Sequence, residues 1–187
     1  MEAKNQTPER ARVMVPLSLS FSKKDKQRTL QPHDDALVVT VRIGGYDARR
    51  VLVNQGSGAK IRYPDLYWGL NLMHEDMDTY DYPLMGFDGK MVVPRGMIRL
   101  PVQVGDVEVQ VNFIVVEAFS PYTAILGRPL LHVVGTVPST LHLKVKYPTQ
   151  GRVGELVGDQ AMARQCLVLA IMQRSSGPAT VTKDPIP

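Results

Sequence analysis

The residues best placed to do chemistry lie in one short segment, where an apolar strand runs into a glycine-rich loop. The strand Arg50–Val53 ends at Asn54, and Gly56, Ser57 and Gly58 follow directly. Such a loop can present a polar side chain at the end of a strand, because glycine permits a tight turn and backbone and hydroxyl groups can donate hydrogen bonds to that side chain. An asparagine there can hold a water molecule by hydrogen bonds, but it cannot shuttle a proton as a carboxylic acid does.

Two later segments have the form expected of partners to this loop. About seventy residues after Asn54, an apolar-apolar-glycine segment precedes a short predicted helix, Arg128–Val134, with Pro129 at its start. Between the loop and this segment lies a predicted hairpin with a glycine-bounded tip. Taken alone, the loop could be an ordinary β-turn of another barrel, and the hairpin a plain surface turn. Their order along the chain is more informative than either motif.

In that order, the three motifs resemble the protease segment of gypsy-type plant long-terminal-repeat retrotransposon polyproteins, which is a retropepsin-like aspartic protease domain. The resemblance covers roughly residues 32–173 and extends to the amino-acid sequences of the segments His33–Val39 and Ser120–Gly127. It implies a mainly β fold, namely a retropepsin-like closed barrel with a flap hairpin, one short C-terminal helix and a helical tail extension.

The resemblance also assigns roles to residues. It places Asn54 at the position of the catalytic aspartate. The active-site loop is Gln55, Gly56, Ser57, Gly58 and Ala59; the flap, which contacts substrate, is Met85, Gly86, Phe87, Asp88 and Gly89; the residues that support the loop are Ile125, Leu126 and Gly127. Two positions depart from the family pattern. Gln55 stands where threonine or serine commonly locks two loops together, and Lys60 stands where an acidic residue is expected.

The family hydrolyses peptide bonds with a water molecule held between two aspartates that share a proton. The chain has one such loop, so the resemblance implies a twofold homodimer that binds an extended peptide in a shared cleft. Asn54 removes acid–base assistance worth about 10²–10⁴ for each positioned group. We therefore expect an aspartic-type endopeptidase domain for polyprotein cleavage that is inactive or nearly so, a pseudoenzyme. The alternative is a non-catalytic peptide-binding or dimerisation module of the same fold.

Changes in composition and in the periodicity of apolar residues along the chain predict three segments. Residues 1–34 form a flexible basic lead-in, residues 35–148 the retropepsin-like domain, and residues 149–187 a C-terminal linker or tail with one possible helix over Glu155–Met172. β-Branched runs separated by turn residues predict strands within the domain. These are Ala36–Ile43, Ala48–Val53, Leu84–Met85, Lys90–Val93, Met97–Val104, Glu108–Val116, Thr123–Leu126 and Leu141–Lys146. A further short helical turn is predicted over Asp65–Leu70.

The positive charge of the chain is concentrated in its first thirty residues. They hold seven Lys and Arg against three Asp and Glu, which equals the whole net charge of +4. A weak contact of this basic tail with nucleic-acid phosphates is one expectation, and a solvated linker is the other. The basic side chains concerned are Lys23, Lys24, Lys26 and Arg28.

Composition excludes several other classes of function. The single cysteine, Cys166, lies in an apolar run and is expected to be an inert packed thiol, which predicts a reducing, intracellular location, the cytoplasm. No apolar stretch is long enough to cross a membrane, so no membrane partner is expected. No cofactor and no metal are predicted, because the four histidines have no ligand spacing and no phosphate-binding glycine pattern follows a strand. The acidic stretch around Glu75 and Asp81 is interpreted as a solvated connection rather than a calcium site.

Overall fold

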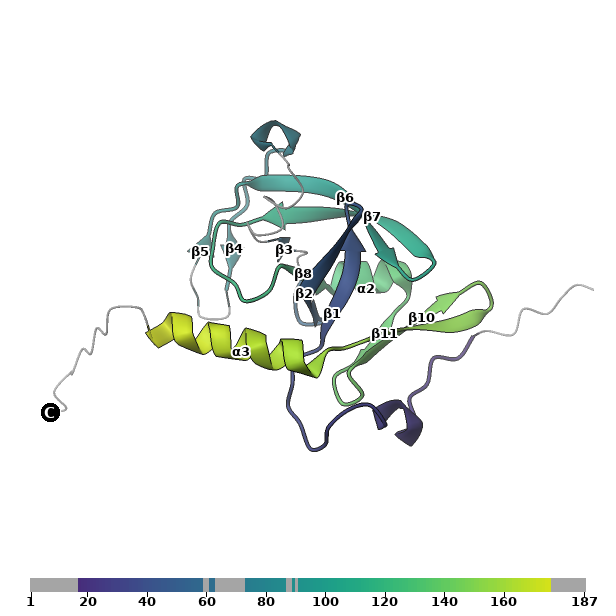
Figure 1. Ribbon diagram of the computed structural model, residues 1–187. Coiled ribbons are helices and arrows are strands. Elements are labelled where there is room, and N and C mark those ends of the chain that lie inside the picture. The colour runs from purple at the N-terminus through teal and green to yellow at the C-terminus, as the bar shows by residue number, and fades with distance from the viewer. Residues whose placement is uncertain (1–16, 59–60, 63–72, 87–88, 90, 176–187) are drawn as a thin grey trace, which may run out of the picture.

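The computed structural model describes residues 17–58, 61–62, 73–86, 89 and 91–175 and has a mainly β architecture (Figure 1). In chain order the elements are η1 (Lys23–Lys26), β1 (Val38–Ile43), β2 (Tyr46–Asn54), β3 (Ile61–Arg62), η2 (His74–Asp76), β4 (Leu84–Met85), β5 (Met91–Val92), β6 (Gly96–Val104), β7 (Val107–Val115), β8 (Ala124–Gly127), α2 (Arg128–Val134), β9 (Val137–Ser139), β10 (Lys144–Thr149), β11 (Arg152–Val157) and α3 (Gln160–Ser175).

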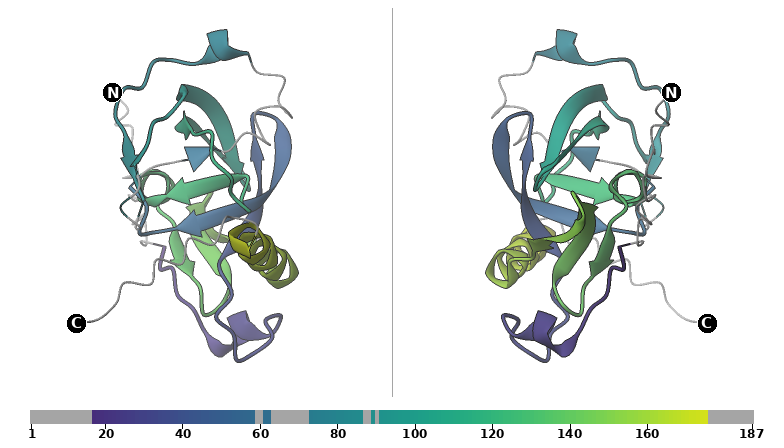
Figure 2. Two further views of the ribbon diagram at one scale, coloured as in Figure 1. Left: turned by 90° about the vertical axis from the view of Figure 1, so that its left-hand side faces the viewer. Right: turned by 90° about the vertical axis from the view of Figure 1, so that its right-hand side faces the viewer.

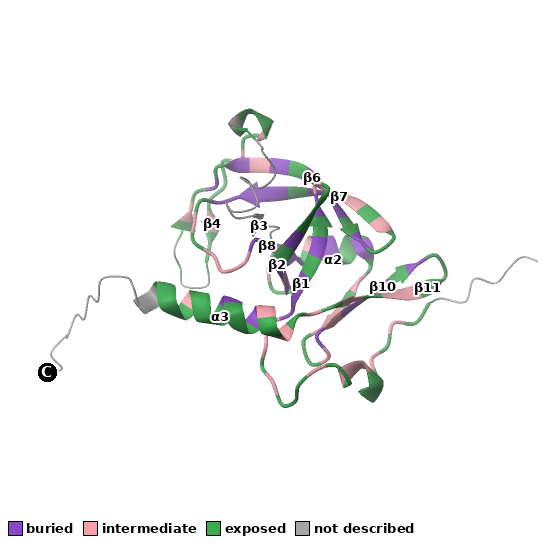
Figure 3. Ribbon diagram, viewed as in Figure 1, coloured by how far each residue is buried: buried purple, intermediate pink, exposed green. Residues whose placement is uncertain are grey.

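The central sheet closes on itself as a barrel in the order β1-β2-β8-β3-β7-β6, with β6 pairing back to β1. Its strands bury alternate residues, as the pattern of β6 shows most clearly, because successive side chains of a strand point to opposite faces. Phe113, Ile43 and Val102 are fully buried in the hydrophobic core. Figure 3 shows buried segments along the strands of the barrel. The predicted mainly β closed barrel is confirmed.

Most predicted strands are present with small shifts at their ends, and one begins later than expected. The strand predicted over Leu141–Lys146 is observed as β10, because a turn occupies residues 140–143 and Leu143 adopts a φ of 46°. The sequence also failed to predict β3, β9 and β11. The predicted turn over Asp65–Leu70 lies outside the described residues.

The predicted helix over Glu155–Met172 is wrong at its start. Residues up to Val157 belong to β11, which pairs along its whole length with β10, and α3 begins only at Gln160. Asp159 sets this start, since its carboxylate accepts a hydrogen bond from the N–H of Met162 at 2.9 Å, the pairing of a helix N-cap. The predicted tail therefore contributes a strand to the sheet β11-β10-β9 before it becomes helical.

The helix α3 lies along one side of the barrel, below β1 and β2 (Figures 1 and 2). Ala163 and Cys166 are its buried residues, and the guanidinium of Arg164 forms two hydrogen bonds, both 3.1 Å long, with the carboxylate of Asp35. The thiol of Cys166 donates to the carbonyl of Pro121, and burial raises the pKa of this thiol. The predicted packing of the cysteine is confirmed, and its low reactivity stays a prediction. None of the helices in the described ranges combines the length and hydropathy that a membrane crossing requires.

Residues 17–34 differ from the expected flexible lead-in, because ion pairs and ring contacts hold them against the sheet β11-β10-β9. Asp25 lies 2.8 Å from the amine of Lys146 and 3.2 Å from that of Lys144, and Lys144 reaches Glu155 at 2.7 Å. Phe21 stacks on His142 with ring centroids 5.0 Å apart. Lys23, Lys24 and Arg28 stay exposed, and their contact with nucleic acid stays a prediction. The segment boundaries at residues 34 and 148 also stay predictions.

These ion pairs predict a fold that is sensitive to acid. Hydrogen bonds from Lys146 hold the pKa of Asp25 well below its ordinary value, and hydrogen bonds from Lys144 and Arg164 lower the pKa values of Glu155 and Asp35. A carboxylate with a lowered pKa stabilises the fold above its unfolded pKa of about 4, and this stabilisation is lost as pH falls through the lowered value. We expect the melting temperature of the chain to fall steadily between pH 5 and pH 3.

The matched variants for this measurement are Asp25→Asn and Asp47→Asn, since Asp47 is exposed on β2. Asp25→Asn should lower the melting temperature at pH 7 and flatten its dependence on pH below about 4. Asp47→Asn should behave as the natural chain does. A parallel fall of all three curves would show that the Asp25 ion pairs do not stabilise the fold.

Candidate functional site

The parallel pairing of β2 with β8 positions Asn54. Its register sets Val53 beside Leu126 and Asn54 beside Gly127. Val53 and Leu126 are both buried, whereas Asn54 is partly exposed where the strand leaves the core. The apolar half of β2 therefore anchors the strand in the barrel, and the first polar side chain after it is presented at the strand end. The pairing sets the loop beside Leu126 and Gly127, and the functional roles assigned to the loop and to these residues stay predictions.

Hydrogen bonds within the loop fix the orientation of Asn54. The N–H of Gly56 donates to Asn54 Oδ1 at 3.0 Å, and the N–H of Ser57 donates to the Asn54 carbonyl at 3.1 Å. A Cβ atom on Gly56 would lie only 3.2 Å from Asn54 Oδ1, so glycine permits this close approach. The N–H of Arg128 donates to the carbonyl of Ser57 at 2.9 Å, which ties the loop to the start of α2.

The two polar atoms of the Asn54 side-chain amide differ in their hydrogen bonding to the described residues. Its oxygen accepts the Gly56 N–H, and its Nδ2 group has no hydrogen bond to any residue in the described part of the chain. A carboxylate in the same position would keep the bond to Gly56 and present its second oxygen where the NH₂ group now stands. The loop is thus built to hold either side chain, but only the carboxylate could exchange a proton.

The side chain of Gln55 forms a hydrogen bond with another part of the same chain. Its Nε2 donates to the carbonyl of Pro138 in β9 at 3.2 Å, so the active-site loop is joined to the sheet β11-β10-β9. The resemblance implied a residue here that locks two loops across a dimer axis. In this structure the longer glutamine side chain instead makes a bond within one chain. The sequence contained no signal for this tether, because β9 was not predicted.

The hairpin predicted to be the flap is present as a separate two-stranded sheet, and its role as a flap stays a prediction. In it Leu84 pairs with Val92 and Met85 pairs with Met91, and the N–H of Gly89 donates to the carbonyl of Gly86 at 3.0 Å. Met85 and Met91 are 74% and 60% exposed, an apolar surface that is free to contact a ligand. Of the remaining predicted site residues, Ala59, Phe87 and Asp88 lie outside the described residues.

The described residues do not form a metal-binding cluster of His, Cys, Asp and Glu side chains. The site that the structure assembles is lined by polar groups. Asn54, Gly56 and Ser57 come from the loop, Gly127 from β8 and Arg128 from α2. This arrangement can hold a small polar group by hydrogen bonds at the end of β2.

No family model matches the sequence, and no curated protein matches it. Solved structures do match its fold. The retroviral protease-like domain of Ddi1 from Leishmania major aligns with a TM-score of 0.53 at 16% identity, over 68% of this chain and 96% of that domain. EIAV protease in complex with an inhibitor aligns at 0.48 and 16% identity over 57% and 94% of the two chains. Simian foamy virus protease aligns at 0.35 and 14% identity over 55% and 99%.

The Leishmania domain establishes the likeness in fold, and its low sequence identity restricts that likeness to the fold. The chain has the barrel of the retroviral protease-like domains, with the glycine-rich loop at the end of β2 and the short helix α2 after β8. What the site does must be argued from its own residues.

Proposed function

We propose that the chain is an aspartic-endopeptidase domain of the gypsy-type plant retrotransposon class, and that asparagine in place of the catalytic aspartate leaves it inactive or nearly so. The observation that carries the proposal is the position of Asn54. It ends β2 beside Gly127 of the parallel strand β8, and its side chain accepts the N–H of Gly56. A backbone N–H aimed at this side chain suits a carboxylate, because hydrogen bonds of this kind stabilise the charged form.

The proposed mechanism needs two copies of the loop. Peptide hydrolysis by this class uses a water molecule between two carboxyl groups, of which one takes the proton of the water and the other gives a proton to the leaving amine. One chain supplies one loop, so the cleft is completed by a second copy related by a twofold axis. With Asn54 in both copies the water can still be held by hydrogen bonds. No carboxylate is then present to take the proton of the water, and no carboxylic acid is present to give a proton to the leaving amine.

The second candidate is a module that binds extended peptides without cleaving them. The exposed Met85 and Met91 favour it, since the hairpin offers apolar surface to a ligand whether or not catalysis follows. The amide of Asn54 supports the same reading, because its NH₂ group can donate to a peptide carbonyl.

The test compares the natural chain with Asn54→Asp on a mixture of unfolded polypeptides. The proposal expects cleavage by the variant alone, and it expects pepstatin to inhibit that cleavage. If neither protein cleaves but both retain extended peptides, the binding module is the function. If the natural chain cleaves robustly at this site, the proposed inactivity is wrong.

A further inference from the structure

The lead-in, residues 17–34, passes below β10 and β11 and ends beside α3 (Figures 1 and 2). A first group of contacts holds it over β10. The amine of Lys146 donates to the carbonyl of Ser20 at 2.8 Å, pairs with the carboxylate of Asp25 at 2.8 Å and lies 4.9 Å from the ring centroid of Phe21. Because Lys146 is only 8% exposed, the groups that compensate its charge come largely from the lead-in.

A second group of contacts lies at the end of the lead-in. The N–H of Leu30 donates to Oε1 of Gln160 at 2.8 Å, and the carbonyl of Leu30 accepts a hydrogen bond from Nε2 of the same side chain at 3.2 Å. The side chains of Gln31 and His33 both reach the carbonyl of Leu141, each at 3.3 Å. Leu141 belongs to the turn between β9 and β10. The lead-in therefore holds this turn as well as β10 and the start of α3.

His142, in the same turn, joins the lead-in to β9. Its ring stacks on Phe21 with the two ring centroids 5.0 Å apart. Its Nδ1 atom lies 2.8 Å from the hydroxyl of Ser139, the last residue of β9. The position of the Phe21 ring therefore limits where the imidazole can lie, and the imidazole holds the end of β9 by a hydrogen bond.

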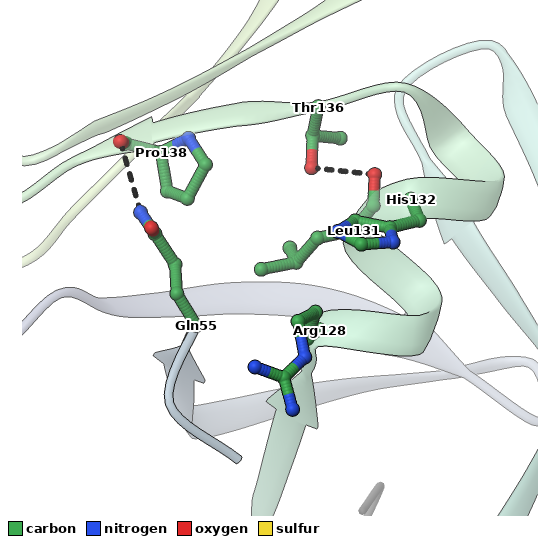
Figure 4. Close-up of a pocket in the computed structure, with 6 residues that line it drawn as sticks. All are labelled: Gln55, Arg128, Leu131, His132, Thr136 and Pro138. Carbon is green, nitrogen blue, oxygen red and sulfur yellow. Dashed lines mark hydrogen bonds between the residues drawn. The ribbon is translucent and has the colours of Figure 1, made fainter. Parts of the chain in front are cut away.

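β9 in turn reaches the active-site loop. The Nε2 group of Gln55 donates to the carbonyl of Pro138 at 3.2 Å, and Figure 4 shows the Gln55 side chain extended from the loop to this carbonyl. Gln55 follows Asn54 directly, and the Asn54 side chain accepts the N–H of Gly56. A series of direct contacts therefore joins the lead-in to the loop.

We propose that the docked lead-in positions the active-site loop, with Phe21 as the positioning residue that acts through His142 and β9. Docking holds the turn after β9, the turn fixes the Pro138 carbonyl, and this carbonyl fixes the Gln55 side chain. The inference rests on the proposed function for its consequence in catalysis, since catalytic groups act only when they are held in the right geometry. Spatial continuity alone does not demonstrate coupling, so the test is a double-mutant cycle.

The experiment measures hydrogen exchange at the backbone amides of Gly56 and Ser57 in the natural chain and in three variants. Phe21→Ala removes the ring that stacks on His142, Gln55→Ala removes the hydrogen bond to β9, and the third variant carries both changes. Phe21→Ala should raise the exchange rate of the two loop amides by about threefold or more relative to the amides that pair β6 with β7. When Gln55→Ala is already present, Phe21→Ala should add no further increase.

Phe119→Ala is the matched control, since Phe119 is 56% exposed in the connection between β7 and β8, and it should leave the loop amides unchanged. Asp25→Asn loosens the lead-in at a different contact and should give the same local increase, which keeps the test decisive if Phe21→Ala fails to fold. An equal rise at every amide would show that the lead-in only stabilises the barrel and would overturn the inference. An effect of Phe21→Ala that is undiminished by Gln55→Ala would overturn it too.

The outcome can be separated from that of the proposed function, because hydrogen exchange is measured without catalysis. Cleavage by Asn54→Asp together with an equal rise in exchange at every amide would remove the positioning role and leave the protease proposal standing. Coupled exchange without cleavage by Asn54→Asp would do the reverse. Where both hold, Phe21→Ala added to Asn54→Asp should lower kcat and leave KM nearly unchanged, since the geometry of the loop is altered and the surface of the hairpin is not.

Discussion

If the proposed function is right, Asn54→Asp is expected to convert an inactive or nearly inactive chain into an active aspartic endopeptidase. General acid–base assistance contributes about 10²–10⁴ in rate for each positioned group, so restoring both groups of a dimer should raise kcat/KM by roughly 10⁴ or more. The loop needs no rebuilding, because the Gly56 N–H already donates to Oδ1 of residue 54 and a carboxylate occupies nearly the same volume as the amide. The measurement is the rate of peptide release from a mixed substrate, with and without pepstatin.

The matched control is Asn112→Asp, which makes the same chemical change at an exposed position of β7. This variant should remain inactive, and its melting temperature should stay close to that of the natural chain. Activity in Asn112→Asp would point to a contaminating protease. An Asn54→Asp variant that is folded, dimeric and inactive would show that the loop does not form a catalytic pair.

Leu126→Ala is expected to have the largest effect on stability among changes near the site. Leu126 is 2% exposed and lies beside Val53 in the parallel pairing of β2 with β8. Removing a buried leucine side chain costs about 2–5 kcal/mol, because apolar burial is lost and a cavity remains. The free energy of unfolding from urea titration, followed by circular dichroism, should fall by that amount.

Ile125→Ala is the matched control, since Ile125 precedes Leu126 on the same strand and is only partly buried. Its loss should be smaller, on the order of 1 kcal/mol. All variants must be compared at one protein concentration, because the stability of the proposed dimer would depend on concentration. Equal losses for the two variants would mean that β8 does not pack its Leu126 face into the core.

The loop, its support by β8 and the short helix α2 could be predicted because each has a local signature. Apolar runs ending at Asn54 and Gly127 mark strands that leave a core, and Pro129 marks the first turn of a helix. The barrel class followed from the spacing of β-branched runs and turns, and from the family resemblance. These signals depend on a few neighbouring residues, so they can be read from the chain without its three-dimensional contacts.

The second sheet and the docked lead-in could not be predicted, because their stabilising contacts join distant parts of the chain. Asp25 and Lys146 form their ion pair across more than a hundred residues, and nothing around Asp25 in the sequence marks a partner. The strand β11 is short and contains Gly154, which weakens its strand signal, so its apolar residues resembled the start of a helix. The tether of Gln55 depends on β9 in the same way, since the amide of Gln55 donates to the carbonyl of Pro138.

The central claim is that residue 54 of two chains meets in one cleft, and mixing the two forms tests it most directly. Asn54→Asp is held at a fixed concentration while the natural chain is added to a tenfold excess. Random pairing leaves only about a tenth of the Asn54→Asp chains paired with each other, and a mixed pair lacks half of its acid–base groups. We predict that proteolysis falls to roughly a tenth of its starting rate. A rate that is unchanged by the natural chain would show that each chain works alone and would contradict the shared cleft.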